Sequence, residues 1–272
     1  MSSFETFSQF EHAGWADETL ALAFHQTLGE LTRGCIPTLL DAADLRPGER
    51  VLDIACGAGY VAAAAHGRGA SATGLDFSAV QIELAEKTYP GIAFVEGDAE
   101  ALPFGDGEFD VVFNAFGLPH LPRPEVAVSE AYRVLRPGGR FLYASWSELG
   151  RCAGLAIVYD AIRLHGSFDV GLPPGPNMFN YGDENFAAQM LVKAGFREIA
   201  TREVPLIWRK PSPDAIIDGI ASGTVRTAAV LKRQNPQNLA QIRRYLSEKI
   251  LAFRDGDAYA LPFSALVVAG RR

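Results

Sequence analysis

Short apolar runs alternate with amphipathic segments over the first half of the chain. Apolar residues at 51–55 and 70–76 are each followed by a segment with helical spacing, as expected when crossover helices connect buried strands. Three later apolar runs, at 92–95, 109–116 and 141–146, continue the series. Strands that alternate with helices form parallel sheets covered by helices on both faces. The pattern therefore predicts an α/β fold with a doubly wound, mostly parallel sheet.

The pattern changes after residue 146. A helix, a turn-rich stretch and a second helix precede a strand-like piece at 196–208, and a helical region at 212–254 precedes another at 263–269. We therefore expect helical cap insertions in the second half. The predicted core consists of a ligand-binding part over 46–147, a helix and strand over 183–210 and a final strand over 255–272. The predicted cap consists of N-terminal helices over 1–45, an insertion over 148–182 and a helical insertion over 211–254.

Composition narrows the class of protein. Of 272 residues, 48% are apolar and 21% are charged, and the formal net charge is −7. This profile is that of a folded globular chain, and it lacks the basic footprint of a nucleic-acid binder. The three cysteines have no metal-like spacing, so we expect reduced thiols and no metal site. With neither a signal sequence nor a long apolar stretch visible, we expect a soluble cytoplasmic protein without a membrane span.

The segment VLDIACGAGYVAA suggests a nucleoside site. Gly57 and Gly59 follow the first strand, where the absence of a Cβ lets a ligand approach the backbone. Asp76 ends the second strand, a position suited to accept hydrogen bonds from two ribose hydroxyls. The stretch 57–62 also satisfies the dinucleotide pattern G-x-G-x-x-G/A, so an NAD-dependent oxidoreductase is an alternative.

Three further features favour a different nucleoside. Asp53 lies inside the strand before the glycines, where a carboxylate suits a ligand that carries an ammonium group. Asp98 and Ala99 follow the third strand, where a carboxylate and a backbone N–H can bind the edge of an adenine. Phe77 offers an apolar face for the same ring. An adenine, a ribose and an amino-acid tail together describe S-adenosylmethionine.

Four stretches in this order resemble the class I S-adenosylmethionine-dependent methyltransferases, in particular the ubiquinone-biosynthesis-like group (methyltransferase type 11). They are VLDIACGAG, TGLDFS, VEGDAEALPFGDGEFDVVFNAFGLPHL and EAYRVLRPGGRFLYASW, and they lie within residues 46–147. The resemblance implies a Rossmann-like sheet of seven strands whose last strand is antiparallel. It also implies S-adenosyl-L-methionine as cofactor and methyl transfer as the activity.

The resemblance assigns cofactor roles to matching positions. It implies that Asp53, Ala55, Gly57 and Gly59 lie near the methionine portion and that Asp76 binds the ribose. The adenine then lies near Phe77, Asp98 and Ala99, and the sulfonium near Asn114 and Phe116.

His120 is a candidate catalytic base because it follows the fourth strand, although it can equally cap or pack there. Many relatives carry two adjacent histidines at GLPHL, and this chain has one, which argues against a role built on a histidine pair. Aromatic residues are more often core than ligand contacts, but four are candidates for the substrate pocket: Tyr60, Trp146, Tyr181 and Trp208.

The segment 223–254 is basic within an acidic chain. It carries seven basic residues and one acidic residue, Glu248. One interpretation is a solvated helical surface, and the other is attraction of an anionic acceptor to the cap. The basic residues are Arg226, Lys232, Arg233, Arg243, Arg244, Lys249 and Arg254.

The function predicted from the sequence is methyl transfer from S-adenosylmethionine to an oxygen, nitrogen or carbon atom of a small organic acceptor. Alignment of the nucleophile with the methyl group supplies most of the rate in such a reaction. A non-catalytic S-adenosylmethionine-binding module is a second alternative beside the oxidoreductase. No nucleic-acid motif is present.

Overall fold

The apolar runs form one mixed sheet in a computed structural model that describes residues 3–272. The strand order is β3-β2-β1-β4-β5-β8-β6, and β7 pairs with β8 outside this path. The strands are β1 (Arg50–Ile54), β2 (Ser71–Asp76), β3 (Ala93–Glu96), β4 (Phe109–Ala115), β5 (Leu135–Trp146), β6 (Arg197–Lys210), β7 (Arg254–Asp255) and β8 (Ala258–Arg271).

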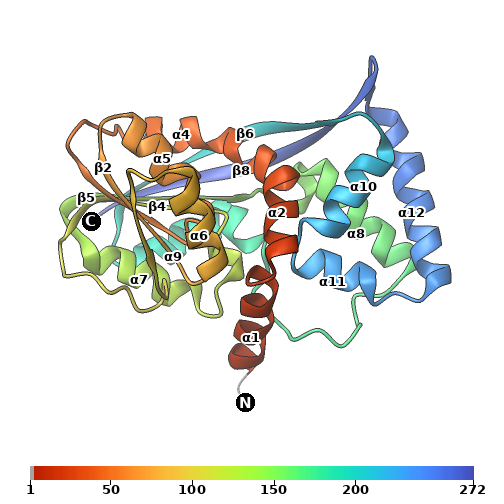
Figure 1. Cartoon of the computed structure of the whole chain (residues 1–272), viewed down its shortest axis with the longest axis horizontal. Helices are drawn as coiled ribbons and strands as arrows, with labels where there is room; N and C mark the ends of the chain where they lie inside the picture. Colours follow the sequence, from red (N-terminus) through yellow and green to blue (C-terminus); the bar gives the residue numbers. More distant parts are fainter. Residues whose placement is uncertain (1–2) are drawn as a thin grey trace.

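The predicted strand directions are confirmed. Strands β1 to β5 pair in parallel, and β8 is antiparallel to both β5 and β6. The sheet has one strand more than predicted, because the two residues of β7 turn back on β8. Strands β6 and β8 are each 14 residues long and extend beyond the other strands (Figure 1).

Helices cover both faces of the sheet, as the alternation predicted. Neighbouring residues of β1 point to opposite faces, so Val51 belongs to one hydrophobic cluster and Leu52 to the other. The helices of the sheet layers are α4 (Ile36–Ala42), α5 (Tyr60–Gly67), α6 (Ala79–Thr88), α7 (Pro124–Val134) and α9 (Glu184–Lys193).

The remaining helices gather beside the carboxyl ends of the central strands (Figure 1). They are α1 (Ser3–Trp15), α2 (Glu18–Gln26), α3 (Leu28–Thr32), α8 (Ala153–His165), α10 (Pro213–Ser222), α11 (Arg226–Lys232) and α12 (Pro236–Ile250). Short 3-10 turns occur at Arg33–Cys35, Leu118–His120, Leu149–Arg151, Asn180–Gly182 and Leu251–Phe253.

These outer helices share a core with the sheet. Val158 of α8, Ile216 of α10 and Leu246 of α12 belong to the same buried cluster as Phe263 and Val267 of β8. Two of the helices begin as their sequences indicate, because Ser212 and Asn235 cap α10 and α12 ahead of a proline. Across residues 3–272, no helix combines the length and apolar character that crossing a membrane requires.

Candidate active site

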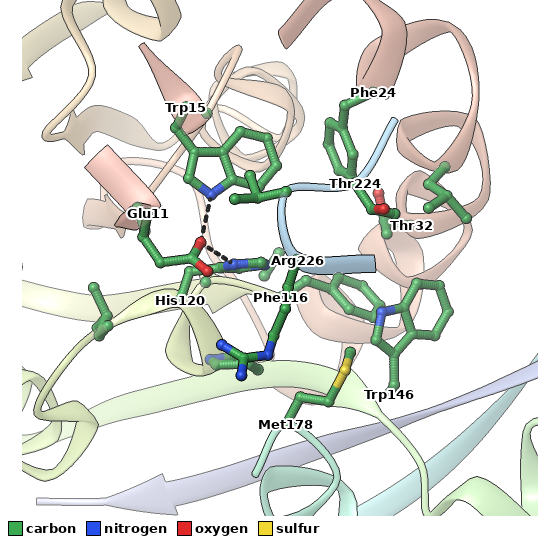
Figure 2. Close-up of a pocket in the computed structure, with 18 of the residues that line it drawn as sticks. Glu11, Trp15, Phe24, Thr32, Phe116, His120, Trp146, Met178, Thr224 and Arg226 are labelled. Atoms are coloured by element: carbon green, nitrogen blue, oxygen red, sulfur yellow. Dashed lines mark hydrogen bonds and ion pairs between the residues drawn. The ribbon is translucent and has the colours of Figure 1, made fainter. Parts of the chain in front are cut away.

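A cavity of about 510 Å³ lies between the carboxyl ends of the central strands and the outer helices. Its floor comes from residues that follow β1, β2 and β4, and its walls come from α1, α2, α8, α11 and the loop before residue 180. Figure 2 shows side chains from several of these elements around it. The crevice at this edge of an open α/β sheet is where such folds bind ligands, and the volume is typical of a site for a small molecule.

The loop after β1 adopts a backbone conformation that suits glycine. Gly57 has φ +52° and Gly59 has φ +79°, both in the left-handed region. A Cβ on Gly59 would lie 2.6 Å from Cζ of Phe94, so this position also lacks space for a side chain. Ala55 has φ +52° without being glycine, a strained conformation of the kind found at ligand sites. Ala55 and Gly57 line the cavity, whereas Gly59 shapes the loop behind it.

Asp76 presents its carboxylate at the end of β2. Its Oδ2 accepts a hydrogen bond from the backbone N–H of Gly57 at 2.8 Å, and its Oδ1 accepts one from Ser78 N–H at 2.9 Å. These two bonds fix the carboxylate while each oxygen keeps a lone pair for a ligand. Burial raises the pKa of Asp76, and the two N–H donors oppose that rise.

Asp53 has one carboxylate oxygen that the protein does not satisfy. Its Oδ2 accepts a hydrogen bond from Ala62 N–H at 3.1 Å, and its buried Oδ1 has no partner among residues 3–272. The side chain is 1% exposed and lines the cavity. Burial, followed by the nearby charge of Asp76, raises the pKa of Asp53 to about 8. An unpaired buried oxygen of this kind is suited to a cationic group of a ligand.

Phe77 also lines the cavity, with one face covered. The ring of His12, from α1, stacks on it with the ring centroids 4.0 Å apart and an angle of 25° between the planes. Only the uncovered part of the phenyl ring is therefore available to a ligand.

The loop after β4 is held by Asn114. The side chain of Asn114 donates to the Ile54 carbonyl at 2.9 Å and accepts from the N–H groups of Gly117 and Leu118 at 3.1 and 3.0 Å. The backbone uses its carbonyl oxygen and one of its N–H donors, and Asn114 is absent from the cavity wall. Phe116 does line the wall, with φ +61°, and packs on Trp146 with ring centroids 4.6 Å apart.

His120 lies in the cavity wall with a buried carboxylate as partner. Its Nδ1 is 2.9 Å from Oε2 of Glu11, and the same oxygen accepts a hydrogen bond from Nε1 of Trp15 at 3.2 Å (Figure 2). Because a carboxylate only accepts, Nδ1 carries the proton in a neutral imidazole, and Nε2 is left to accept one. Glu11 is 2% exposed, so these two hydrogen bonds replace the contacts that its carboxylate would make with water.

Besides Gly59 and Asn114, four of the predicted residues lie away from the cavity wall. Asp98 is exposed, and its Oδ1 accepts from Glu100 N–H at 2.8 Å, which makes it a turn residue beside the buried Ala99. Tyr181 is buried with Phe186 on the opposite side of the sheet. Trp208 packs against Phe263 in the core. Tyr60 and Trp146 are the two candidate pocket aromatics that line the cavity.

Several lining residues have no counterpart among the sequence candidates. They include Glu11, His25, Arg33 and Gln81, and all of these but Gln81 come from helices or turns outside the sheet layers. The basic segment 223–254 was the sequence signal for a charged residue in the cavity wall. Of its seven basic residues, one lines the cavity. Arg226 is that residue (Figure 2).

The other arginines of the basic segment have partners elsewhere. Arg243 pairs with Asp218 at 2.8 Å, and Arg244 pairs with Glu248 at 2.9 Å on the surface of α12. By contrast, Arg226 donates to the Pro173 carbonyl at 2.9 Å, and no ion pair of its guanidinium occurs among the described residues. No group of three or more potential metal ligands occurs in residues 3–272.

Comparison with known proteins gives a consistent picture. Two family models match, one described as "Methyltransferase domain" over residues 52–143 and one as "Protein-L-isoaspartate(D-aspartate) O-methyltransferase" over residues 3–91. A ubiquinone/menaquinone biosynthesis C-methyltransferase of Ruegeria sp. is 32% identical over 189 residues, which are 62% of this chain and 74% of that protein.

A demethylmenaquinone methyltransferase of Beutenbergia cavernae is 44% identical over 108 residues, 40% of this chain. That match spans 45% of the relative, so the chain covers less than half of it. Among solved structures, a candidate methyltransferase from Bacillus halodurans has a TM-score of 0.57 at 23% identity, covering 87% of this chain and 97% of that one. At this identity the structural likeness shows the fold.

Proposed function

The chain belongs to the class I S-adenosylmethionine-dependent methyltransferases of the ubiquinone-biosynthesis type, and from this we propose that it methylates a small organic acceptor. One cavity is lined both by Asp76, at the end of β2, and by the aromatic residues Trp15, Phe24, Phe116 and Trp146, which we call the aromatic chamber. This shared cavity is the observation that carries the proposal. A nucleoside donor and an apolar acceptor then share one enclosed space.

The residues present fit S-adenosylmethionine. The carboxylate of Asp76 is held by two backbone N–H groups and keeps acceptor capacity for ribose hydroxyls. The unpartnered Oδ1 of Asp53 suits the ammonium of an amino-acid tail, and the left-handed loop at Gly57 gives the tail room. We propose that Phe77 contacts the adenine ring and that Phe116 lies beside the sulfonium group.

When bound, S-adenosylmethionine supplies an electrophilic methyl group on a sulfonium sulfur. The contribution of this chain is alignment, because holding two reactants in a productive geometry can lower a barrier by roughly 7–11 kcal/mol in ideal cases. Phe116 and Trp146 form a rigid aromatic wall beside the strand ends. The cap residues over that wall exclude water, and we propose that residues 1–45, 148–182 and 211–254 act together as the acceptor-selecting cap.

We further propose that the acceptor is a flat aromatic molecule with an ionisable hydroxyl or acid group. Support comes from Trp15, Phe24, Phe116 and Trp146 around the chamber and from the unpaired Arg226 within it. The relatives from Beutenbergia cavernae and Ruegeria sp. are named a demethylmenaquinone methyltransferase and a ubiquinone/menaquinone biosynthesis C-methyltransferase, and these names fit a quinol-like acceptor. Three free, buried cysteines support a cytoplasmic location.

We propose that His120 is the base that removes a proton from the acceptor. With Nδ1 bonded to Glu11, Nε2 is free to accept a proton from an acceptor hydroxyl, and the Glu11 carboxylate stabilises the imidazolium that forms. Arg226 then offsets the negative charge left on the acceptor. Each of these roles belongs to a residue of the cavity wall.

Binding of S-adenosylhomocysteine tests the donor half of the proposal. We expect calorimetry to detect its binding to the wild-type protein and no binding of NAD. Asp76→Ala should weaken it roughly 100-fold, because two hydrogen bonds to a charged acceptor are lost. Asp76→Asn serves as a milder variant if the alanine variant unfolds, and Asp160→Ala is the control at an exposed aspartate. Binding of NAD in place of S-adenosylhomocysteine would favour an oxidoreductase.

Methyl transfer from labelled S-adenosylmethionine to a panel of quinols, phenolic acids and small amines tests the acceptor half. We expect turnover with the acidic aromatic acceptors, a KM raised about tenfold in Arg226→Met because a charge-assisted contact is lost, and a lower kcat in His120→Gln. Arg244→Met, whose partner is Glu248 on the surface, is the matched control. Preference for amines with Arg226→Met unchanged would contradict this acceptor class, and binding without any turnover would favour a non-catalytic module.

A further inference from the structure

The ring of His12, from α1, covers one face of Phe77 at the sheet edge where the donor is proposed to bind. The two ring centroids are 4.0 Å apart, and the angle between the planes is 25°. A flat aromatic ligand stacks on a phenyl ring with similar geometry. Phe77 directly follows Asp76, the residue proposed to bind the ribose, and the adenine is joined to that sugar. His12 therefore lies on a surface that an adenine can use.

The cavity ends at this stacked pair. Asp76 and Phe77 line its wall, but Asp98 and Ala99, the residues predicted at the adenine edge, do not. The loop that carries them starts beside Phe77, because the carbonyl of Asp76 accepts a hydrogen bond from Gly97 N–H at 2.9 Å. The cavity thus stops short of the loop that was expected to bind the adenine, at the ring that is covered.

The imidazole of His12 is held less firmly than its neighbours on α1. Its side chain is exposed, and no hydrogen bond or ion pair of its ring occurs among residues 3–272. By contrast, Glu11 lies 2.9 Å from His120, and the carbonyl of Trp15 accepts from Ser78 at 2.9 Å, so α1 itself is anchored. Exposed side chains change rotamer within nanoseconds. His12 can therefore turn toward water while the helix stays in place.

We propose that His12 competes with the adenine of the donor for the same face of Phe77, so that the donor has to displace it. The inference rests on the proposed function, since it concerns the same donor site. His12 then sets the affinity for the donor, because only the fraction of molecules whose Phe77 face is uncovered can bind it. The opposite role is a platform, in which the stack on His12 holds Phe77 in place for an adenine that binds elsewhere on the ring.

A series of substitutions at position 12 separates the two roles, because they predict opposite orders of affinity. By calorimetry we expect His12→Ala to bind S-adenosylhomocysteine about threefold to tenfold more tightly than the wild type, the range that the loss of one aromatic stack allows. His12→Trp should bind it more weakly, because a larger ring stacks more strongly on Phe77. 5′-Methylthioadenosine has the same adenine without the amino acid, so its affinity should change by the same factors.

Two further variants make the series interpretable. His12→Gln keeps a polar side chain without a ring and should bind as tightly as His12→Ala, which covers the case in which the alanine variant does not fold. His66→Ala changes an exposed histidine of α5 outside the cavity wall and is the matched control. Thermal melting checks that each variant is folded.

Weaker binding in both His12→Ala and His12→Gln would overturn the inference and make His12 a platform for Phe77. Equal affinity across the series would also overturn it, because the adenine would then bind without touching the covered face. A change for S-adenosylhomocysteine alone would place the effect at the amino-acid part and contradict the competition for Phe77. Failure of the proposed function gives a different result, in which the wild-type protein binds neither ligand.

Discussion

At the scale of single residues, the proposed donor pocket contains a buried polar atom that has no hydrogen-bond partner within residues 3–272, the Oδ1 of Asp53. Burial raises the pKa of Asp53 to about 8 from an ordinary value of 3.8. Between those two values the folded protein holds a proton that the unfolded chain releases. Its contribution therefore lowers the stability of the unliganded protein as the pH rises through that range. A ligand ammonium reverses this balance by stabilising the ionised carboxylate.

We accordingly predict that S-adenosylhomocysteine binding releases a proton at pH 7. Asp53 is mostly protonated there before binding and becomes ionised when the ammonium pairs with it, so affinity should rise with pH toward 8. Calorimetry in buffers of different ionisation enthalpy measures the number of protons released. Asp53→Asn should abolish the release and weaken the ligand, since it removes the charge while keeping an acceptor for Ala62. Zero release from the wild-type protein would show that the ammonium binds elsewhere.

At the scale of elements, α1 is the part of the chain that encloses the donor site. Glu11 bonds His120, the ring of His12 stacks on Phe77, and the carbonyl of Trp15 accepts from Ser78 Oγ at 2.9 Å. These contacts lie on one helix and reach the residues after β2 and β4. Because α1 contacts the cavity-lining residues Phe77 and His120, we expect this helix to act as a gate for the donor.

Hydrogen exchange of α1 checks that role. We predict that backbone amides of Ser3–Trp15 exchange more slowly with S-adenosylhomocysteine bound, because the ligand adds contacts to a helix that already touches the donor-site residues Phe77 and Ser78. The amides of α12, which packs on α8 away from the donor residues, should change little and serve as the internal control. Equal exchange of α1 with and without ligand would exclude it as the gate.

At the scale of the whole molecule, the fold follows from the sequence more directly than the site does. The mostly parallel, doubly wound sheet is confirmed because alternating apolar runs and helices allow few topologies. Four motifs led to the family that the comparisons confirm. Asp53 and Asp76 could be placed at the strand ends because a strand fixes where its last residues point.

Residues supplied by helices could not be placed in this way. Glu11, Arg33 and Arg226 reach the cavity only because packing brings three distant segments over one sheet edge, and no local pattern encodes that approach. Asp98 illustrates the opposite difficulty, since a short polar residue after a strand serves a turn as readily as a ligand. The assignment of individual binding residues therefore stays a prediction for the experiments above.

Strands β6 and β7 both pair with β8, and this pairing brings the two ends of the segment between them close together. Lys210, at the end of β6, and Arg254, at the start of β7, both pair with Tyr259 of β8. The two ends of the segment between them therefore lie only two strand spacings apart, about 10 Å. A replacement segment of different length can join the same two points without shifting the register of any strand. If residues 211–254 select the acceptor, as we propose, acceptor preference can change through this segment without moving the strands that carry Asp53 and Asp76.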